Sequence, residues 1–136
     1  MITAVDTSVL LDVFGADPTF GPQSRKAVRS CLSEGRLVAC EVVWAEVGSF
    51  FPTAEATQDA MSRLGIEYSP MELGTALAAG GVWKLYRSRG GQRERMVADF
   101  LIGAHALSQA ERLLTRDRGF YRTYFSRLRV LDPAKV

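Results

Sequence analysis

Four acidic residues stand in apolar segments of the chain, each close to a predicted strand or to the start of a predicted helix. Asp6 ends the first predicted strand, and Glu46 lies in the helix after the second strand. Asp99 opens an apolar helix, and Asp117 follows the fourth predicted strand by two residues. Carboxylates bordered by Val, Leu, Ile and Phe are costly to bury unless they are paired or bind a cation. These four side chains are therefore the first candidates for chemistry.

A cluster of such acids favours binding of a hard divalent cation. Clustered carboxylates repel one another, which raises some of their pKa values, and Mg²⁺ or Mn²⁺ removes this penalty while accepting oxygen ligands. Each acid alone also has a simpler explanation. Asp6 could cap a helix, Asp99 could stabilise a first helical turn, Asp117 could be a turn residue and Glu46 could be solvated. The metal-site interpretation depends on the four acids lying together.

Short apolar strands alternate with helices along the chain. We predict strands at 2–5, 37–40, 66–68, 112–115 and 129–131, and helices at 8–14, 22–34, 42–51, 55–64, 72–88 and 98–111. Thr7 and Ser8 offer hydroxyls for the N-cap of the first helix. The alternation predicts one domain over residues 1–136, an α/β fold built as a three-layer α/β/α sandwich with a mostly parallel central sheet. Functional groups of such sheets gather at the carboxyl ends of the strands.

Composition narrows the class of protein further. No apolar run approaches the roughly 20 residues that span a bilayer, and the first residues lack a basic leader, so we expect a soluble cytoplasmic protein without a membrane partner. Cys31 and Cys40 lie in apolar segments without the spacing of a zinc site. We expect both cysteines to be buried hydrophobic residues.

Charge is distributed unevenly along the chain. Residues 1–82 contain ten acids and five bases, a formal charge of −5, whereas residues 83–136 contain five acids and twelve bases, a charge of +7. Such asymmetry is typical of a phosphate-binding surface, although arginines on solvated helix faces produce the same pattern. Four arginines close in sequence to Asp99 and Asp117 are the candidates for binding the phosphates of a substrate backbone: Arg93, Arg95, Arg116 and Arg118.

The segments that contain the four acids resemble a known family. VDTSVLLDVF, AEVGSFF, ADFLIGAHAL and LLTRDRGFY occur in this order, and together they resemble the PIN-domain nucleases over nearly the entire chain. The Asp-Thr-Ser start, the Asp followed by Leu-Ile-Gly-Ala and the Thr-x-Asp-x-x-Phe ending are most similar to the VapC toxins of toxin–antitoxin pairs. Each motif alone is weak, and their order and spacing make the combination specific.

The resemblance implies a metal-dependent endoribonuclease that uses Mg²⁺ or Mn²⁺, forms a homodimer and is inhibited by a cognate VapB-like antitoxin. The family's catalytic and metal-binding acids correspond to Asp6, Glu46, Asp99 and Asp117, with Thr115 as a hydroxyl donor that supports them. One or two metal ions held by these acids would polarise the scissile phosphate and activate a water for in-line attack.

The sequence also departs from its relatives and leaves one alternative open. Cys40-Glu41 and the Gln92 to Arg95 segment differ from the usual family pattern, which affects the substrate groove and not the four acids. Paired early acids and a late Lys, typical of phosphoacceptor receiver domains, are missing, and so is the second Asp of dehalogenase-like phosphatases. A catalytically silent PIN module that binds RNA or an antitoxin remains the alternative.

Other conspicuous residues have structural explanations. His105 and Glu41 point away from the acids on helical geometry, and Asp12 is expected at the surface or at a dimer edge. Trp44, Trp83 and the apolar residues Phe50, Phe51, Leu77 and Leu85 are expected in the core or in dimer contacts. The aromatic residues from Phe120 to Phe125 follow helical spacing and are expected to pack.

Overall fold

A five-stranded parallel sheet forms the centre of the molecule. The computed structural model describes residues 1–91 and 97–136. Its strands are β1 (Ile2–Val5), β2 (Arg36–Ala39), β3 (Ile66–Tyr68), β4 (Arg112–Leu114) and β5 (Val130–Leu131), in the spatial order β3-β2-β1-β4-β5. Every neighbouring pair is parallel, which confirms the predicted sheet. β2 ends one residue before the predicted end, because Cys40 is the N-cap residue of the next helix.

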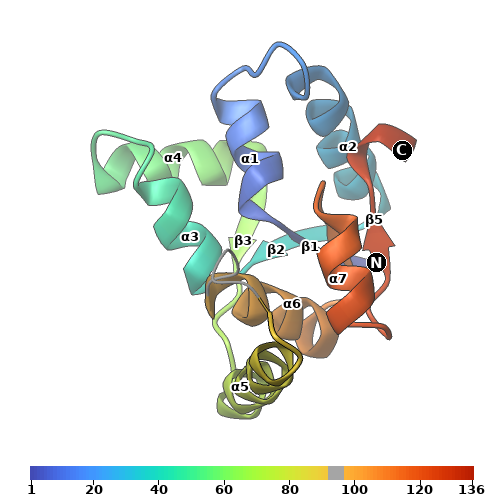
Figure 1. Ribbon diagram of the computed structural model, residues 1–136. Helices are drawn as coiled ribbons and strands as arrows, with labels where there is room; N and C mark the ends of the chain where they lie inside the picture. Colours follow the sequence, from blue (N-terminus) through green and yellow to red (C-terminus); the bar gives the residue numbers. More distant parts are fainter. Residues whose placement is uncertain (92–96) are drawn as a thin grey trace.

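Helices cover both faces of this sheet, so the molecule is the predicted three-layer sandwich. In Figure 1, α1 and α2 lie on one side of the sheet and α5 and α6 on the other. The helices are α1 (Thr7–Phe14), α2 (Gly21–Glu34), α3 (Glu41–Gly48), α4 (Ala54–Leu64), α5 (Leu73–Ser88), α6 (Val97–Gln109) and α7 (Arg118–Tyr124), followed by a short 3₁₀ helix η1 (Pro133–Lys135). Among the described helices, none combines the length and apolar character that crossing a membrane requires.

The strands are apolar because both faces of the sheet are covered. Val5, Leu37, Val38 and Leu113 are each at most 2% exposed, and burying a side chain of this size contributes about 1.5–3 kcal/mol. Cys31 and Cys40 are buried and free, as their apolar segments predicted.

The order of the strands reverses the direction of winding at β1. The chain moves outward from β1 to β2 and β3, then returns to the opposite side of β1 to form β4. In open parallel sheets, ligands bind at the carboxyl ends of the strands where the direction of winding reverses. Val5 pairs with Leu114 in register, and the Asp6 N–H donates to the Leu114 carbonyl at 2.9 Å. The residues that follow β1 and β4 are therefore neighbours.

Helix α6 brings a third segment close to β1 and β4. It packs on β4 and β1 and carries Asp99 in its first turn. One turn further along, Gly103 lies against Phe125, and a Cβ atom there would be only 2.5 Å from the Phe125 ring. A side chain at position 103 would push α6 away from the C-terminal segment, so this glycine contributes to the placement of Asp99.

Candidate active site

A buried hydroxyl joins the acids that follow β1 and β4. Asp6 is 8% exposed and Thr115 is fully buried. The Thr115 Oγ1 donates to Asp6 Oδ2 at 2.7 Å and accepts a hydrogen bond from the Asp117 backbone N–H at 3.0 Å. Thr115 therefore fixes the orientation of the Asp6 carboxylate and the start of the Asp117 turn with one side chain.

A second hydroxyl holds Glu46. The Thr7 Oγ1 donates to Glu46 Oε1 at 2.7 Å and so ties α1 to α3. The prediction that Thr7 caps α1 was wrong. Asp6 occupies the N-cap position without a side-chain capping bond, and the Thr7 hydroxyl is directed to the carboxylate of the neighbouring helix. Glu46 itself is exposed on α3, within reach of a ligand.

The charges of Asp99 and Glu46 reach the Asp6 carboxyl group. Burial is the largest cause that raises the pKa of Asp6, to about 6, and the negative charges of Asp99 and Glu46 raise it further. Hydrogen bonds from Thr115 and from the backbone N–H of Thr7 lower this pKa in part. The repulsion expected of clustered carboxylates is therefore present around Asp6.

These acids form an all-oxygen set of donors, which suits a hard cation such as Mg²⁺ or Mn²⁺. In residues 1–91 and 97–136, no group of three or more His, Cys, Asp or Glu side chains is already close enough together to hold a metal ion. A bound ion would have to draw the carboxylates closer together than they lie in this structure. The buried Asp6 carboxyl, which the charges of Asp99 and Glu46 oppose in its ionised form, fits such an ion by its chemistry.

The predicted RNA-binding arginines lie in different surroundings. Arg93 and Arg95 are outside the described residues. Arg118 is partly exposed and pairs with Asp132 at 3.1 Å. Arg116 donates to the Asp12 carboxylate through Nε at 2.8 Å and through Nη2 at 3.1 Å. Some of the positive charge of the second half of the chain is therefore used in ion pairs.

Asp12 was predicted at the surface or at a dimer edge, and this prediction was wrong. The residue is 5% exposed and is neutralised by Arg116. The apolar residues around Asp12 in SVLLDVF could have indicated that this acid is buried. A buried charge requires a partner. The partner lies 104 residues away in the sequence, so the pairing itself could not be read from local pattern.

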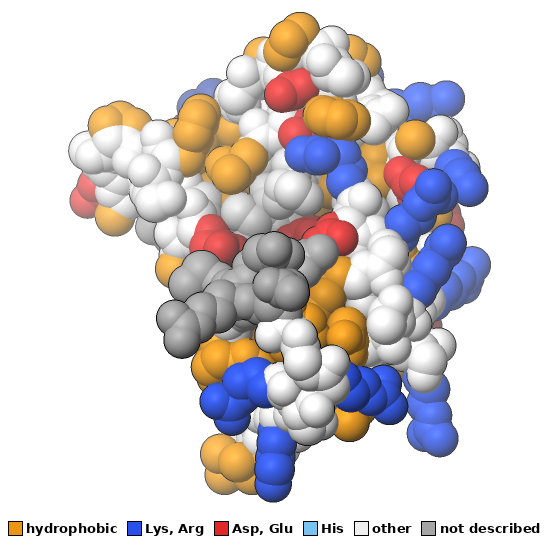
Figure 2. Space-filling model, in the orientation of Figure 1, with side chains coloured by type: hydrophobic (Ala, Val, Ile, Leu, Met, Phe, Trp, Pro, Cys, Tyr) orange, Lys and Arg blue, Asp and Glu red, His pale blue; other side chains and the backbone are white. Residues whose placement is uncertain are grey.

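The surface around the acids carries both signs of charge. In Figure 2, acidic side chains gather near the middle of the face shown, and Lys and Arg side chains lie along its right-hand and lower edges. A basic border around an acidic centre is suited to a polyanion whose backbone is held at the edges while a phosphate reaches the acids.

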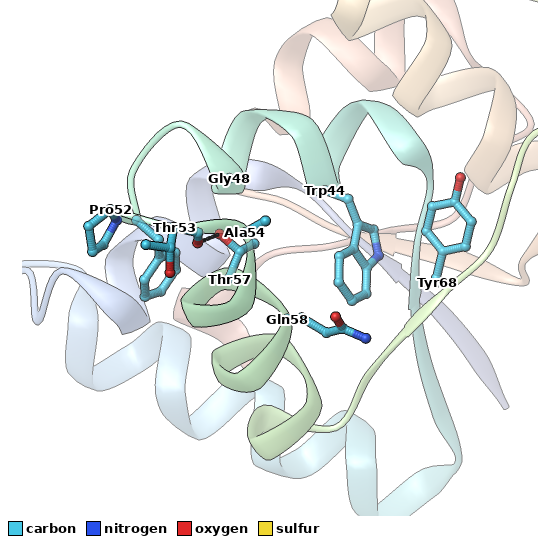
Figure 3. Close-up of a pocket in the computed structure, with 9 residues that line it drawn as sticks. Trp44, Gly48, Pro52, Thr53, Ala54, Thr57, Gln58 and Tyr68 are labelled. Carbon is cyan, nitrogen blue, oxygen red and sulfur yellow. Dashed lines mark hydrogen bonds between the residues drawn. The ribbon is translucent and has the colours of Figure 1, made fainter.

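An apolar pocket lies apart from the acids. It has a volume of about 640 Å³ between α3, α4 and β3, and Trp44, Gln58 and Tyr68 surround one end of it (Figure 3). The Trp44 and Tyr68 rings meet edge to face with centroids 5.7 Å apart. The Trp44 Nε1 is buried and has no hydrogen-bond partner in the described part of the chain. Phe50, expected in the core or in dimer contacts, follows the C-terminal end of α3 and is 51% exposed.

His105 and Glu41 have structural contacts, in agreement with their predicted direction away from the acids. The His105 Nε2 lies 3.0 Å from the Ser69 Oγ, and both Glu41 carboxylate oxygens accept from the Met71 backbone N–H. These bonds hold the connection between β3 and α5.

Comparison with known families agrees with this fold. The PIN domain model matches residues 3–126, which is most of the chain. The protein therefore belongs to the PIN domain family, as its four acidic segments predicted. No curated protein matches it in sequence.

Solved structures show the same fold at low sequence identity. A chain of VapBC2 from Rickettsia felis, bound to a DNA fragment from its promoter, has a TM-score of 0.76 at 17% identity and covers 97% of this chain and 98% of its own. A chain of VapBC-1 from nontypeable Haemophilus influenzae has a TM-score of 0.75 at 21% identity, over 98% and 99% of the two chains. DNA-bound VapBC from Salmonella typhimurium gives 0.70 at 16% identity, over 98% of each chain.

The raised pKa of Asp6 predicts a specific dependence of stability on pH. Below about pH 4 the carboxyl is protonated in both the folded and unfolded states, and above about pH 6 it is charged in both. Folding therefore becomes less favourable as pH rises through this window, by on the order of 3 kcal/mol. In EDTA, Asp6→Asn should be more stable than wild type at neutral pH, and the gain should vanish near pH 4.

Urea unfolding across this pH range measures the effect, with the exposed acid of Asp59→Asn as the control. An Asp6→Asn protein that is less stable than wild type at neutral pH in EDTA would show that the Asp6 charge is favourable in the fold.

Proposed function

We propose that this chain is a metal-dependent endoribonuclease and the toxin of a VapBC-type toxin–antitoxin pair. The observation that carries the proposal is the buried Asp6 at the carboxyl end of β1, beside β4 of a PIN fold, where the negative charges of Asp99 and Glu46 add to the effect of burial and raise the pKa of its carboxyl group. A carboxylate buried at this position is costly to the fold, and a divalent cation would offset that cost. With RNA as the substrate, we infer that the protein acts in the cytoplasm.

Each acid has a role in this proposal. Asp6, Asp99 and Asp117 would hold Mg²⁺ or Mn²⁺, and Glu46 would be a further ligand or would orient the attacking water. The ion, when bound, would supply Lewis-acid polarisation of the scissile phosphate and a more acidic water. Thr115 keeps the Asp6 carboxylate in a fixed rotamer, and Thr7 does the same for Glu46. These hydroxyls limit the reorganisation needed when substrate arrives.

Arginines near the acids would hold the RNA. Arg93 and Arg95 precede Asp99 closely in sequence, and Arg118 follows Asp117, so guanidinium groups there would contact phosphates on either side of the scissile bond. Arg118 is partly exposed and keeps donors available beside its pair with Asp132. The competing function, a silent PIN module that binds RNA or an antitoxin, would keep these contacts and lack cleavage.

A VapB-like antitoxin is the proposed protein partner. The support is the likeness of the whole chain to chains of VapBC assemblies and of a toxin–antitoxin complex from Klebsiella pneumoniae. The apolar pocket beside Trp44 offers such a partner a surface whose lining contains none of the four acids.

A homodimer is the proposed assembly, and α5 presents the candidate interface. Leu73 and Leu77 lie one turn apart and are 76% and 69% exposed. Residues 73–83 contain no charged side chain. Exposed leucines on an uncharged helix face are typical of an interface rather than of a solvated surface.

Replacement of Asp99 tests the catalytic proposal. Asp99→Asn keeps the shape of the side chain and removes one negative charge, and an amide is a poorer ligand for a hard cation. Cleavage of a fluorogenic RNA in Mn²⁺ should fall by more than about 100-fold, because the metal is lost or misplaced. Melting in EDTA and RNA binding in EDTA should persist. Asp59→Asn, at an exposed ion pair on α4, is the matched control and should cleave like wild type.

Two outcomes count against the proposal. A folded Asp99→Asn protein that cleaves at the wild-type rate removes Asp99 from the site. A wild-type protein that binds RNA and does not cleave it in either Mg²⁺ or Mn²⁺ favours the silent module.

Replacement of an α5 leucine tests the dimer. Leu77→Glu places a charge at the centre of the proposed interface and should convert a dimer into a monomer, because a buried unpaired carboxylate opposes association. Light scattering on a sizing column measures the mass. Ser62→Glu, which adds the same charge on the exposed side of α4, should leave the dimer intact. Leu77→Glu that remains dimeric would place the interface elsewhere.

A further inference from the structure

The ion pair between the buried Asp12 and the partly exposed Arg116 lies outside the four acids and has no assigned role. The Asp12 carboxylate lies in α1 and is 5% exposed. Its Oδ2 accepts from the Ser24 Oγ of α2 at 2.8 Å and from the Arg116 Nε at 2.8 Å, and its Oδ1 accepts from the Arg116 Nη2 at 3.1 Å. Both carboxylate oxygens are therefore occupied, in the forked geometry that only arginine provides.

The guanidinium of Arg116 is fixed on its face as well as on its edge. Its central carbon lies 4.0 Å from the centroid of the Phe20 ring, which precedes α2. A planar cation held by two hydrogen bonds and a stacked ring has one orientation. Arg116 thus joins the segment after β4 to α1 and to the start of α2.

Arg116 lies in the sequence between two residues of the proposed acidic site. Its neighbour Thr115 donates to Asp6, and its other neighbour Asp117 is one of the proposed metal ligands. The Asp117 backbone N–H in turn donates to Thr115. A displacement of the backbone at Arg116 would therefore move the hydroxyl that orients Asp6 and the carboxylate that follows it.

We propose that Asp12 and Arg116 are positioning residues for the acidic site, which hold the turn from Thr115 to Asp117 against α1. The inference rests on the proposed nuclease function and names a mechanism by which two residues without a metal contact set the rate. It also separates Arg116 from Arg93, Arg95 and Arg118. Arg116 acts through the placement of acids, and the other three act through contact with phosphates.

Arg116→Lys is the primary test, because lysine keeps the charge and loses the fork. The single-turnover rate at saturating RNA should fall by about 10- to 100-fold, the range for residues that orient metal ligands. RNA affinity in EDTA and the slope of log affinity against log salt should stay at wild-type values, since no phosphate contact is lost. The rise in melting temperature on adding Mn²⁺ should shrink, which reports metal placement without catalysis.

Asp12→Asn provides an independent second variant if Arg116→Lys does not fold. It should lower the single-turnover rate and the Mn²⁺-induced rise in melting temperature in the same way. The double variant should be no slower than the slower single variant, because both changes break one unit. Asp59→Asn and Arg63→Lys, at the exposed ion pair of α4, form the matched control cycle and should leave both readouts unchanged.

The outcomes separate this inference from the function on which it rests. A shallower salt slope with weaker RNA binding in Arg116→Lys makes Arg116 a phosphate contact and overturns the inference. Folded variants with wild-type rates and wild-type Mn²⁺ stabilisation also overturn it. A wild-type protein that never cleaves RNA overturns the proposed function instead. The Mn²⁺-induced rise in melting temperature then decides the positioning role: a smaller rise in the variants supports it, and an equal rise overturns it.

Discussion

The burial of one carboxylate at the carboxyl end of β1 is the constraint on which the site depends. Because β1 lies between β2 and β4, the residue that follows it is enclosed by the strands and helices on both sides. At neutral pH the Asp6 carboxyl group is ionised although burial and the negative charges of Asp99 and Glu46 oppose its ionisation. An acid in this position weakens the fold unless something compensates it. A divalent cation at the site would offset this free-energy cost, and the charged carboxylate would be its ligand.

Two threonine hydroxyls orient the carboxylates of Asp6 and Glu46. Thr115 and Thr7 donate neutral hydrogen bonds to Asp6 and Glu46, which fix geometry without cancelling charge. The strong cationic partner, Arg116, is directed to Asp12. The charge of Arg116 is thus neutralised by Asp12, whereas the Asp6 carboxylate accepts a hydrogen bond from the neutral Thr115 hydroxyl. The contacts of Asp12 with Ser24 and Arg116 connect the packing of α1 and α2 to the segment after β4.

Sequence alone predicted the five strands and the helices α1 to α6, because the periodicity of apolar residues is a local pattern. The four acids stood out against the apolar residues around them, and their joint role in one site stays a prediction. Contacts between distant segments were not predictable. Asp12 was expected at the surface, since its partner Arg116 is 104 residues away, and the Thr7 hydroxyl was assigned to a helix cap although it binds Glu46 on another helix. Both errors concern side chains whose partners are chosen by tertiary packing, which no helical or strand periodicity encodes.

The central claim, that the acids beside β1 and β4 hold a divalent cation, is tested most directly by locating the ion. Crystals of the full chain grown with MnCl₂ and measured at the manganese absorption edge give an anomalous difference map in which manganese stands out from carbon, nitrogen and oxygen atoms. The account predicts a peak within coordination distance, about 2.0–2.6 Å, of an Asp6 oxygen and of at least one oxygen from Asp99, Asp117 or Glu46. Crystals of Asp6→Asn grown alongside should lack it. A peak elsewhere, or none at a Mn²⁺ concentration that supports RNA cleavage, would contradict the account.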